Sequence, residues 1–246
     1  MEWSKVSCVF PVSRSSHRVS VIGDRLYMFG GEHEARTPVA SQLHALDLND
    51  GAEGDWTLVA AKGDIPSARF GHGMCSVGSS LYVFGGRMGT AIDEKLLNDV
   101  YKFDTVTSTW SKVTCSGAVP CERSYHSMVS HGSSLYVFGG CPAAGRLADL
   151  HCLDTETAVW TALPSGGMEG RGGTPLAVTP DGSALYVVGG FAGREMADIH
   201  RFDIASNTWS REEQVGIKFS PENTEHKDCP AGAVPGTERG GVCRAP

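Results

Sequence analysis

Arginine and histidine recur together in this sequence, three residues apart. The Arg-x-x-His motif occurs at Arg14/His17, Arg69/His72 and Arg123/His126. A guanidinium binds carboxylate or sulfate oxygens through parallel N–H donors, and an imidazole can bind a metal ion. The three motifs could therefore build an anion site or a metal site if the fold brings them together.

These motifs are part of a longer internal repeat. Gly-Gly pairs follow one another at intervals of about 50 to 55 residues, at Gly30-Gly31, Gly85-Gly86, Gly139-Gly140 and Gly189-Gly190. Tryptophans keep the same period, at Trp56, Trp110, Trp160 and Trp209, and Trp3 stands one period earlier. An arginine opens each unit, at Arg14, Arg69, Arg123 and Arg171.

Each unit contains the pattern of four strands. The run LYMFGG, LYVFGG or LYVVGG indicates a short buried strand ended by its glycines, and the next run alternates apolar with polar residues and ends in aspartate. The aspartate then suits an Asx turn that leads to a fourth strand beginning at the tryptophan. Four strands in about 50 residues, with Gly-Gly and Trp at fixed places, are typical of a kelch blade.

We therefore predict an all-β kelch β-propeller with four complete blades and the start of a fifth. Its repeats occupy residues 1–216, an irregular segment occupies 217–231, and an incomplete further repeat containing Arg239 occupies 232–246. The Trp3 segment resembles the fourth strand of a blade and is expected to close the ring by completing a last blade. Either that closing blade is missing from the sequence, or the propeller closes in a different way. Because one blade cannot bury both of its faces, stability must be collective.

The repeat also limits what its recurrent side chains can mean. A position that recurs in every unit is more often structural than catalytic, so we expect the histidines to form local hydrogen bonds near the inner rim rather than to bind metal. The arginines either form a positive ring at one mouth of the channel or pair with an acid of a neighbouring blade. Asp198 and His200 lie where Asn98, Asp99 and Asp149 lie in earlier units and are assigned to blade architecture.

Charge and hydropathy exclude two classes of partner. The net charge is −7 and no run of Lys or Arg could follow a phosphate backbone, so nucleic acid is not expected. No window approaches the ~20 apolar residues of a membrane span, and the N-terminus lacks the basic and apolar regions of a secretion signal. We expect a cytoplasmic protein.

The chain also resembles the plant nitrile-specifier and epithiospecifier proteins. The resemblance covers residues 2–216 and is carried by RSSH (14–17), FGGE (29–32), FGGR (84–87), YKFDTVTSTW (101–110), RSYHSM (123–128), GRGG (170–173) and GFAGREMADIHRFDIASNTW (190–209). It implies a six-bladed propeller that, with ferrous iron, directs glucosinolate aglycones toward nitriles instead of isothiocyanates.

The resemblance implies one substrate-binding residue. In that family an arginine directly after a Gly-Gly lies near the substrate, and Arg87 matches it, so its guanidinium could pair with the sulfate of the aglycone. The alternative is a solvated loop residue. The iron ligands of the family follow a Glu-x-x-x-Asp-x-x-x-His pattern, which this chain does not contain, so we name no metal ligand. Glu32 lacks the partners, and a further acidic group has the wrong spacing, at Glu222, Glu225, His226 and Asp228.

A second function remains open beside the first. A non-catalytic kelch propeller could bind a protein partner through the loops after each Gly-Gly, such as EHEARTPVASQLH (32–44) and RMGTAIDEKLLND (87–99). No Ser-His-Asp or Cys-His set is readable, and no catalytic residue is named. Whether the chain is an enzyme that acts on a small sulfur-containing substrate or a binding module is therefore left to the structure.

Overall fold

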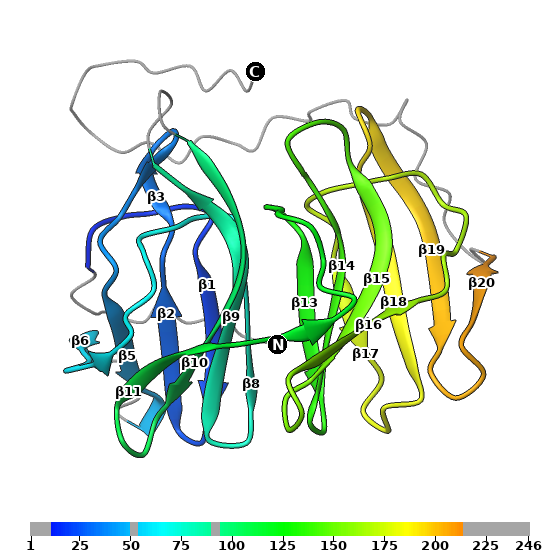
Figure 1. Cartoon of the computed structure of the whole chain (residues 1–246). Helices are drawn as coiled ribbons and strands as arrows, with labels where there is room; N and C mark the ends of the chain where they lie inside the picture. The colour runs from blue at the N-terminus through cyan, green and yellow to red at the C-terminus, as the bar shows by residue number, and fades with distance from the viewer. Residues whose placement is uncertain (1–10, 50–53, 90–93, 214–246) are drawn as a thin grey trace, which may run out of the picture. The chain divides into compact units, whose positions relative to one another are not determined.

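Each repeat of the sequence forms one antiparallel sheet in the computed structural model, which describes residues 11–49, 54–89 and 94–213 (Figure 1). The first blade contains β1 (Arg18–Ile22), β2 (Arg25–Phe29), β5 (Leu43–Asp47) and β6 (Thr57–Leu58). The second contains β8 (Gly73–Val77), β9 (Ser80–Met88), β10 (Lys95–Asp104) and β11 (Thr109–Val113). The all-β prediction with four blades is confirmed.

The other two blades follow the same order of strands. The third contains β13 (Ser127–His131), β14 (Ser134–Gly140), β15 (Leu147–Asp154) and β16 (Val159–Leu163). The fourth contains β17 (Leu176–Val178), β18 (Ala184–Phe191), β19 (Glu195–Asp203) and β20 (Thr208–Glu212). Trp3, the irregular segment 217–231 and the further repeat 232–246 lie outside the described residues.

Four short strands complete the described part of the chain. β7 (Lys62–Gly63) and β12 (Ser116–Gly117) add a parallel outer strand to the second and third blades. β3 (Glu32–Glu34) and β4 (Thr37–Pro38) form a short hairpin after the first Gly-Gly. No helix in the described residues has the length and apolar composition needed to cross a membrane.

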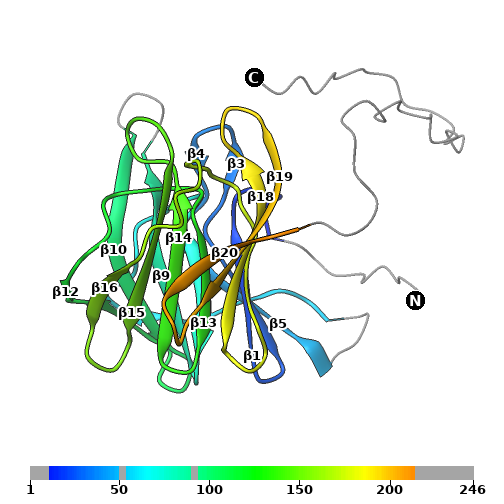
Figure 2. The same cartoon turned by 90° about the vertical axis from the view of Figure 1, so that its right-hand side faces the viewer.

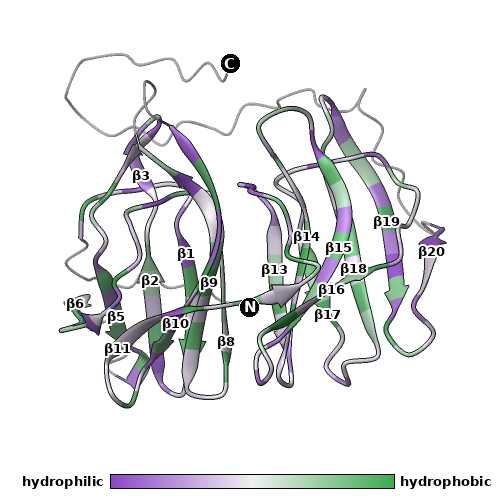
Figure 3. Cartoon of the chain, viewed as in Figure 1, coloured by the Kyte–Doolittle hydropathy of each residue, from purple (hydrophilic) through white to green (hydrophobic). Residues whose placement is uncertain are grey.

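The first strands of the blades lie next to one another. β1 contacts β8, β8 contacts β13 and β13 contacts β17, so consecutive blades are neighbours around an inner row of strands (Figures 1 and 2). In Figure 3 the hydrophobic colour follows strands such as β14 and β18, while β19 and β20 carry more of the hydrophilic colour. The arrangement places the apolar strands where two blades can cover them.

The alternation within each LYVF run explains this packing. Leu81 and Val83 belong to the core shared with the first blade, whereas Tyr82 and Phe84 belong to the core shared with the third. Successive side chains of a strand point to opposite faces, so one run supplies both interfaces of its blade. Burial of such apolar area contributes on the order of 25 cal/mol for each Å².

The repeat tryptophans close the same interfaces from the outer side. Trp110 is 1% exposed, and its ring centroid lies 5.4 Å from that of Phe29 in the first blade. Trp160 lies 5.2 Å from Phe84 in the equivalent place. Trp110, Trp160 and Trp209 therefore each pack against the phenylalanine that precedes the Gly-Gly of the previous blade.

The Gly-Gly pairs do not end their strands in the second and fourth blades, contrary to the sequence prediction. β9 and β18 continue past both glycines, whereas β14 ends at Gly140, and in all three blades the pairing with the next strand shifts register there. Both glycines have positive φ, for example +62° and +95° at Gly85 and Gly86. This conformation makes a bulge rather than a stop, because glycine adopts it without a steric penalty.

Candidate functional site

The repeat arginines of the second to fourth blades are buried ion-pair partners. Arg69, Arg123 and Arg171 are each 0% exposed. Each donates through both Nη atoms to one carboxylate: Arg69 to Asp99 at 2.6 and 3.2 Å, Arg123 to Asp149 at 2.7 and 2.8 Å, and Arg171 to Asp198 at 2.5 and 3.0 Å. Both alternatives that we considered for these arginines were wrong: they form no positive ring, and the paired acid lies in their own blade.

Further hydrogen bonds explain why these arginines tolerate burial. The same Nη1 of Arg171 donates to the Gly189 carbonyl at 3.1 Å, and its Nε donates to the Glu169 carbonyl. The hydrogen bond from Arg171 lowers the pKa of Asp198 to about 2, with a further contribution from His200. A paired charge with satisfied donors is stable in a buried place, whereas a lone one is not. Asp198 is thus part of blade architecture, as the sequence indicated.

The recurrent histidines do not form the local hydrogen bonds that we expected. The ring nitrogens of His72 and His126 are buried without a hydrogen-bond partner. Their rings instead meet aromatic rings edge to face, with His72 5.6 Å from Phe29 and His126 5.1 Å from Phe84. Burial, reinforced by the charge of Arg123, lowers the pKa of His126 to about 3, and burial holds the pKa of His72 well below its usual range.

Both imidazoles are therefore neutral core residues between blades. The described residues contain no group of three His, Cys, Asp or Glu side chains that could hold a metal ion. Glu222, Glu225, His226 and Asp228 lie outside the described residues. The prediction of a ferrous-iron cofactor stays a prediction.

A chain of backbone hydrogen bonds joins the blades at their inner rim. The residue two positions after each repeat arginine has a left-handed φ of 53–60°, at Ser16, Gly71, Tyr125 and Gly173. Gly71 N donates to Ser16 O at 3.0 Å, Tyr125 N donates to Gly71 O at 2.7 Å, and Gly173 N donates to Tyr125 O at 2.9 Å. The turn before each first strand thereby fixes the spacing of the blades around the inner row.

Arg87, the candidate that the family resemblance implied, lies next to this rim. Its Nε donates to Ser124 Oγ at 2.7 Å and its Nη1 to Glu94 Oε1 at 2.8 Å. The guanidinium also lies over the Tyr125 ring, 5.8 Å from its centroid. The side chain is 20% exposed, so Arg87 is neither a free loop residue nor a fully buried one.

Glu32, the residue after the first Gly-Gly, belongs to the same cluster. Its carboxylate accepts hydrogen bonds from Ser16 Oγ and from the Arg36 backbone N–H, each at 2.7 Å. Burial and the Glu32 charge raise the pKa of Tyr125. Residues that follow the Gly-Gly of two different blades therefore meet around Tyr125 as a compact polar cluster.

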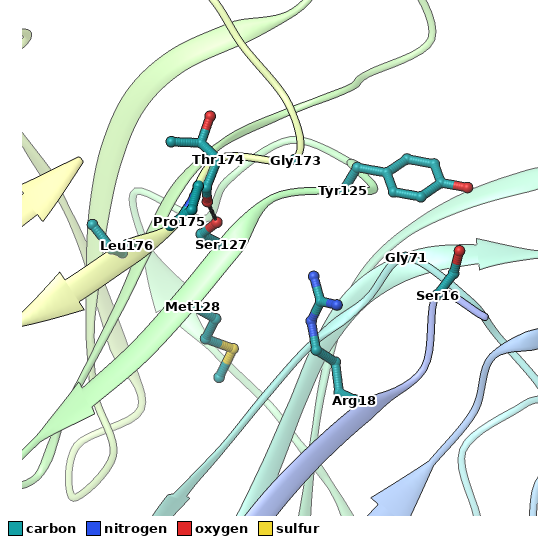
Figure 4. A pocket seen from close by; sticks show the side chains of 10 residues that line it. All are labelled: Ser16, Arg18, Gly71, Tyr125, Ser127, Met128, Gly173, Thr174, Pro175 and Leu176. Atoms are coloured by element: carbon teal, nitrogen blue, oxygen red, sulfur yellow. Dashed lines mark hydrogen bonds between the residues drawn. The ribbon is translucent and has the colours of Figure 1, made fainter. Parts of the chain in front are cut away.

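A cavity of about 470 Å³ opens beside the rim, between the first strands of the blades (Figure 4). It is lined by Ser16, Arg18, Gly71, Tyr125, Ser127, Met128, Gly173, Thr174, Pro175 and Leu176. In Figure 4 the Arg18 guanidinium extends into this space. The sequence analysis missed Arg18, although an alignment of the four repeats shows an arginine where the other units have Gly73, Ser127 and Pro175.

The comparisons with known proteins agree with this architecture. The KLHDC2/KLHL20/DRC7 Kelch-repeats domain matches residues 2–229. The chain belongs to the kelch-repeat family. The Gly-Gly bulges, blade tryptophans and rim turns described above are thus the repeated framework of a kelch propeller.

Two relatives bear on the function of this kelch protein. It is 40% identical over 152 residues to an N-(sulfonatooxy)prop-2-enimidothioate sulfolyase of Thlaspi arvense, which covers 58% of this chain and 41% of the relative. It is 34% identical over 132 residues to human Kelch domain-containing protein 3, which covers 54% of this chain and 33% of the relative. The chain thus spans less than half of the length of each of these relatives.

Proposed function

We propose that this kelch protein binds a small organic sulfate on the face formed by the residues after the Gly-Gly pairs and directs its breakdown, as specifier proteins do. The likeness to a protein named as an N-sulfonatooxy thioimidate sulfolyase supports the class of substrate. The position of Arg87 supports the place, since it follows a Gly-Gly and is the residue that the family resemblance selects.

The observation that carries this proposal is the fixed and partly exposed guanidinium of Arg87. Glu94 and Ser124 hold two of its nitrogens, and Tyr125 supports its plane. A guanidinium that is already oriented loses little conformational entropy when it pairs with a tetrahedral anion. Glu94 also competes for that charge, so an incoming sulfate must share Arg87 with a carboxylate.

Ferrous iron belongs to the proposal only through the family resemblance. No group of described side chains fits it, as shown above, so no chemical step through iron is derived from these residues. The contribution that follows from this chain is substrate binding and orientation at Arg87.

The test measures how the products of one substrate are distributed. The N-sulfonatooxy thioimidate would be released from its thioglucoside by a β-thioglucosidase, with and without ferrous iron, and nitrile, thiocyanate and isothiocyanate would be quantified by gas chromatography. The protein should raise the nitrile or thiocyanate share several-fold, and Arg87→Ala should remove most of that increase. Arg25→Ala, which changes an exposed arginine in β2 of the first blade, is the matched control and should leave the distribution unchanged.

Two results would contradict the proposal. One is a product distribution identical to that of the protein-free reaction while the protein is folded by circular dichroism. The other is an equal loss of the effect in Arg87→Ala and Arg25→Ala.

The other candidate function is non-catalytic binding of a protein partner. The β3–β4 hairpin presents exposed side chains at His33, Glu34 and Arg36, and Phe191 after the fourth Gly-Gly is 43% exposed. These features suit an interaction surface. Affinity purification would support this function if a partner protein bound to the wild type and did not bind to the folded Phe191→Ser variant.

A further inference from the structure

At one position in the inner row of strands, the first blade has a different kind of residue from the other three blades. The residue four places after each repeat arginine is Arg18, Gly73, Ser127 or Pro175. Gly73, Ser127 and Pro175 are uncharged, whereas Arg18 places a guanidinium in the cavity between the first strands (Figure 4). The repeat therefore does not require a charge here.

Among the residues that the structure describes, no carboxylate lies within salt-bridge distance of Arg18. Its one hydrogen bond goes to the His17 carbonyl at 3.3 Å, and none of the salt bridges in the described residues includes it. Burial lowers the pKa of Arg18, but a guanidinium stays protonated in proteins. The contrast with Arg69, which has the same charge and a bidentate acid, shows that this fold normally pairs an arginine that it buries.

The charged and titratable groups around Arg18 leave its charge unbalanced. The charge of Arg18 contributes to the lowered pKa of both His72 and His126, so these imidazoles face it as neutral groups. Glu32, the acid next to the rim, accepts hydrogen bonds at both of its oxygens from Ser16 and the Arg36 backbone. A half-buried positive charge without a counterion attracts an anion from solution.

The rest of the cavity suits a ligand with a short organic part. Ser16 and Tyr125 line one side, with the Ser16 hydroxyl already donating to Glu32, and Met128, Pro175 and Leu176 place apolar surface on the other. Ser127 Oγ already donates to the Thr174 carbonyl and is not free to bind. An apolar wall with one charged anchor is the usual composition of a small-molecule site.

We infer that the cavity binds a small organic oxyanion, with Arg18 pairing with the anionic group and Met128 and Leu176 contacting the organic part. This goes beyond the proposed function, because it concerns a different arginine and requires no breakdown of the ligand. The two can therefore fail separately.

Isothermal titration calorimetry with butyl sulfate tests the inference, with inorganic sulfate as a second probe. Wild-type protein should bind one butyl sulfate per chain, and Arg18→Gln should weaken binding at least about tenfold. Arg18→Lys should retain part of the affinity, since it keeps the charge without the planar donors. Arg25→Gln, which changes an exposed arginine of the same sheet, should bind as the wild type does.

The competing outcomes are distinct. Failure of folded wild-type protein to bind butyl sulfate would overturn the inference, as would unchanged affinity in Arg18→Gln. Loss of binding in Arg87→Gln but not in Arg18→Gln would show that the anion binds at Arg87, which would overturn the inference. Equal affinity for inorganic and butyl sulfate would remove the role of the apolar wall, which Leu176→Ser tests independently by weakening butyl sulfate alone. Thermal unfolding of each variant shows whether it is folded.

Discussion

The first blade and the three that follow it contain the same repeat arginine but surround it differently. Arg69, Arg123 and Arg171 are fully buried against an aspartate of their own blade. Arg14 is half-buried and donates to the Gly30 and Val12 carbonyls, because Gln42 stands where the other blades have the aspartate. The repeat arginine is thus fully buried only in the blades that supply an aspartate to pair with it.

Arg18 extends this comparison to the inner row. The first blade has a guanidinium there, and the next two blades have Gly73 and Ser127. The comparison teaches that the recurrent charges of this propeller belong to its framework. The candidate binding groups lie where a blade departs from the repeat.

The largest effect should come from removing a framework arginine. Arg69→Met leaves the Asp99 carboxylate and the Gly85 carbonyl without their donor, so we expect a loss of about 3–5 kcal/mol in the free energy of unfolding. Arg14→Met, the equivalent change in the first blade, should cost less than about 1 kcal/mol. Urea denaturation of the two variants measures the difference, and equal losses would refute the distinction between the blades.

Acid should destabilise the interfaces through the buried histidines. The folded state holds the pKa of His126 at about 3, mainly by burial, whereas the unfolded chain has a value near the ordinary ~6.5. The unfolded state alone therefore binds the proton as pH falls below ~6.5, and stability decreases by up to about 1.4 kcal/mol per pH unit for each such histidine.

Unfolding free energies at pH 7.5 and 5.5 test this linkage. The difference between the two pH values should be smaller in His126→Gln than in the wild type. The control variant His33→Gln changes an exposed histidine of the β3–β4 hairpin and should keep the wild-type difference. A wild-type pH dependence in His126→Gln would show that this imidazole titrates normally in the folded protein.

The smallest effect should come from restoring the acid that the first blade lacks. Gln42→Asp supplies Arg14 with the partner that Asp99 gives to Arg69, and a half-exposed pair of this kind is worth up to about 1 kcal/mol. We expect a small rise in the urea midpoint, which 1 M salt should reduce. Gln42→Glu tests the geometry, since its longer side chain does not match the repeat. A loss of stability in Gln42→Asp would mean that Arg14 does not occupy the place of the other arginines.

Much of the blade framework could be predicted from the sequence, because its characteristic residues recur in each repeat. Gly-Gly and tryptophan at intervals of about 50 to 55 residues predicted four blades. The aspartates before each turn predicted hydrogen bonds that the structure contains, such as those from the Val106 and Thr107 N–H groups to Asp104. The Arg–Asp pairs could also have been found, since Asp99, Asp149 and Asp198 recur in step with their arginines and the first unit lacks one.

The site was harder to predict, because its properties depend on neighbours from other blades. Arg87 was selected by resemblance, but its contacts with Glu94 and Ser124 do not follow from its position after Gly-Gly. The histidines were assigned local hydrogen bonds because nothing in the sequence shows that Phe29 and Phe84 of the preceding blades cover them. Whether a given arginine has a counterion is likewise a property of packing between blades.

The most direct test that the first blade has an uncompensated arginine is anomalous diffraction from crystals soaked in selenate, a sulfate analogue. We predict a selenium peak in the cavity at hydrogen-bonding distance from the Arg18 guanidinium, no peak at Arg69, Arg123 or Arg171, and no cavity peak in Arg18→Gln crystals. An empty cavity in wild-type crystals, or a cavity peak that persists in Arg18→Gln, would contradict it.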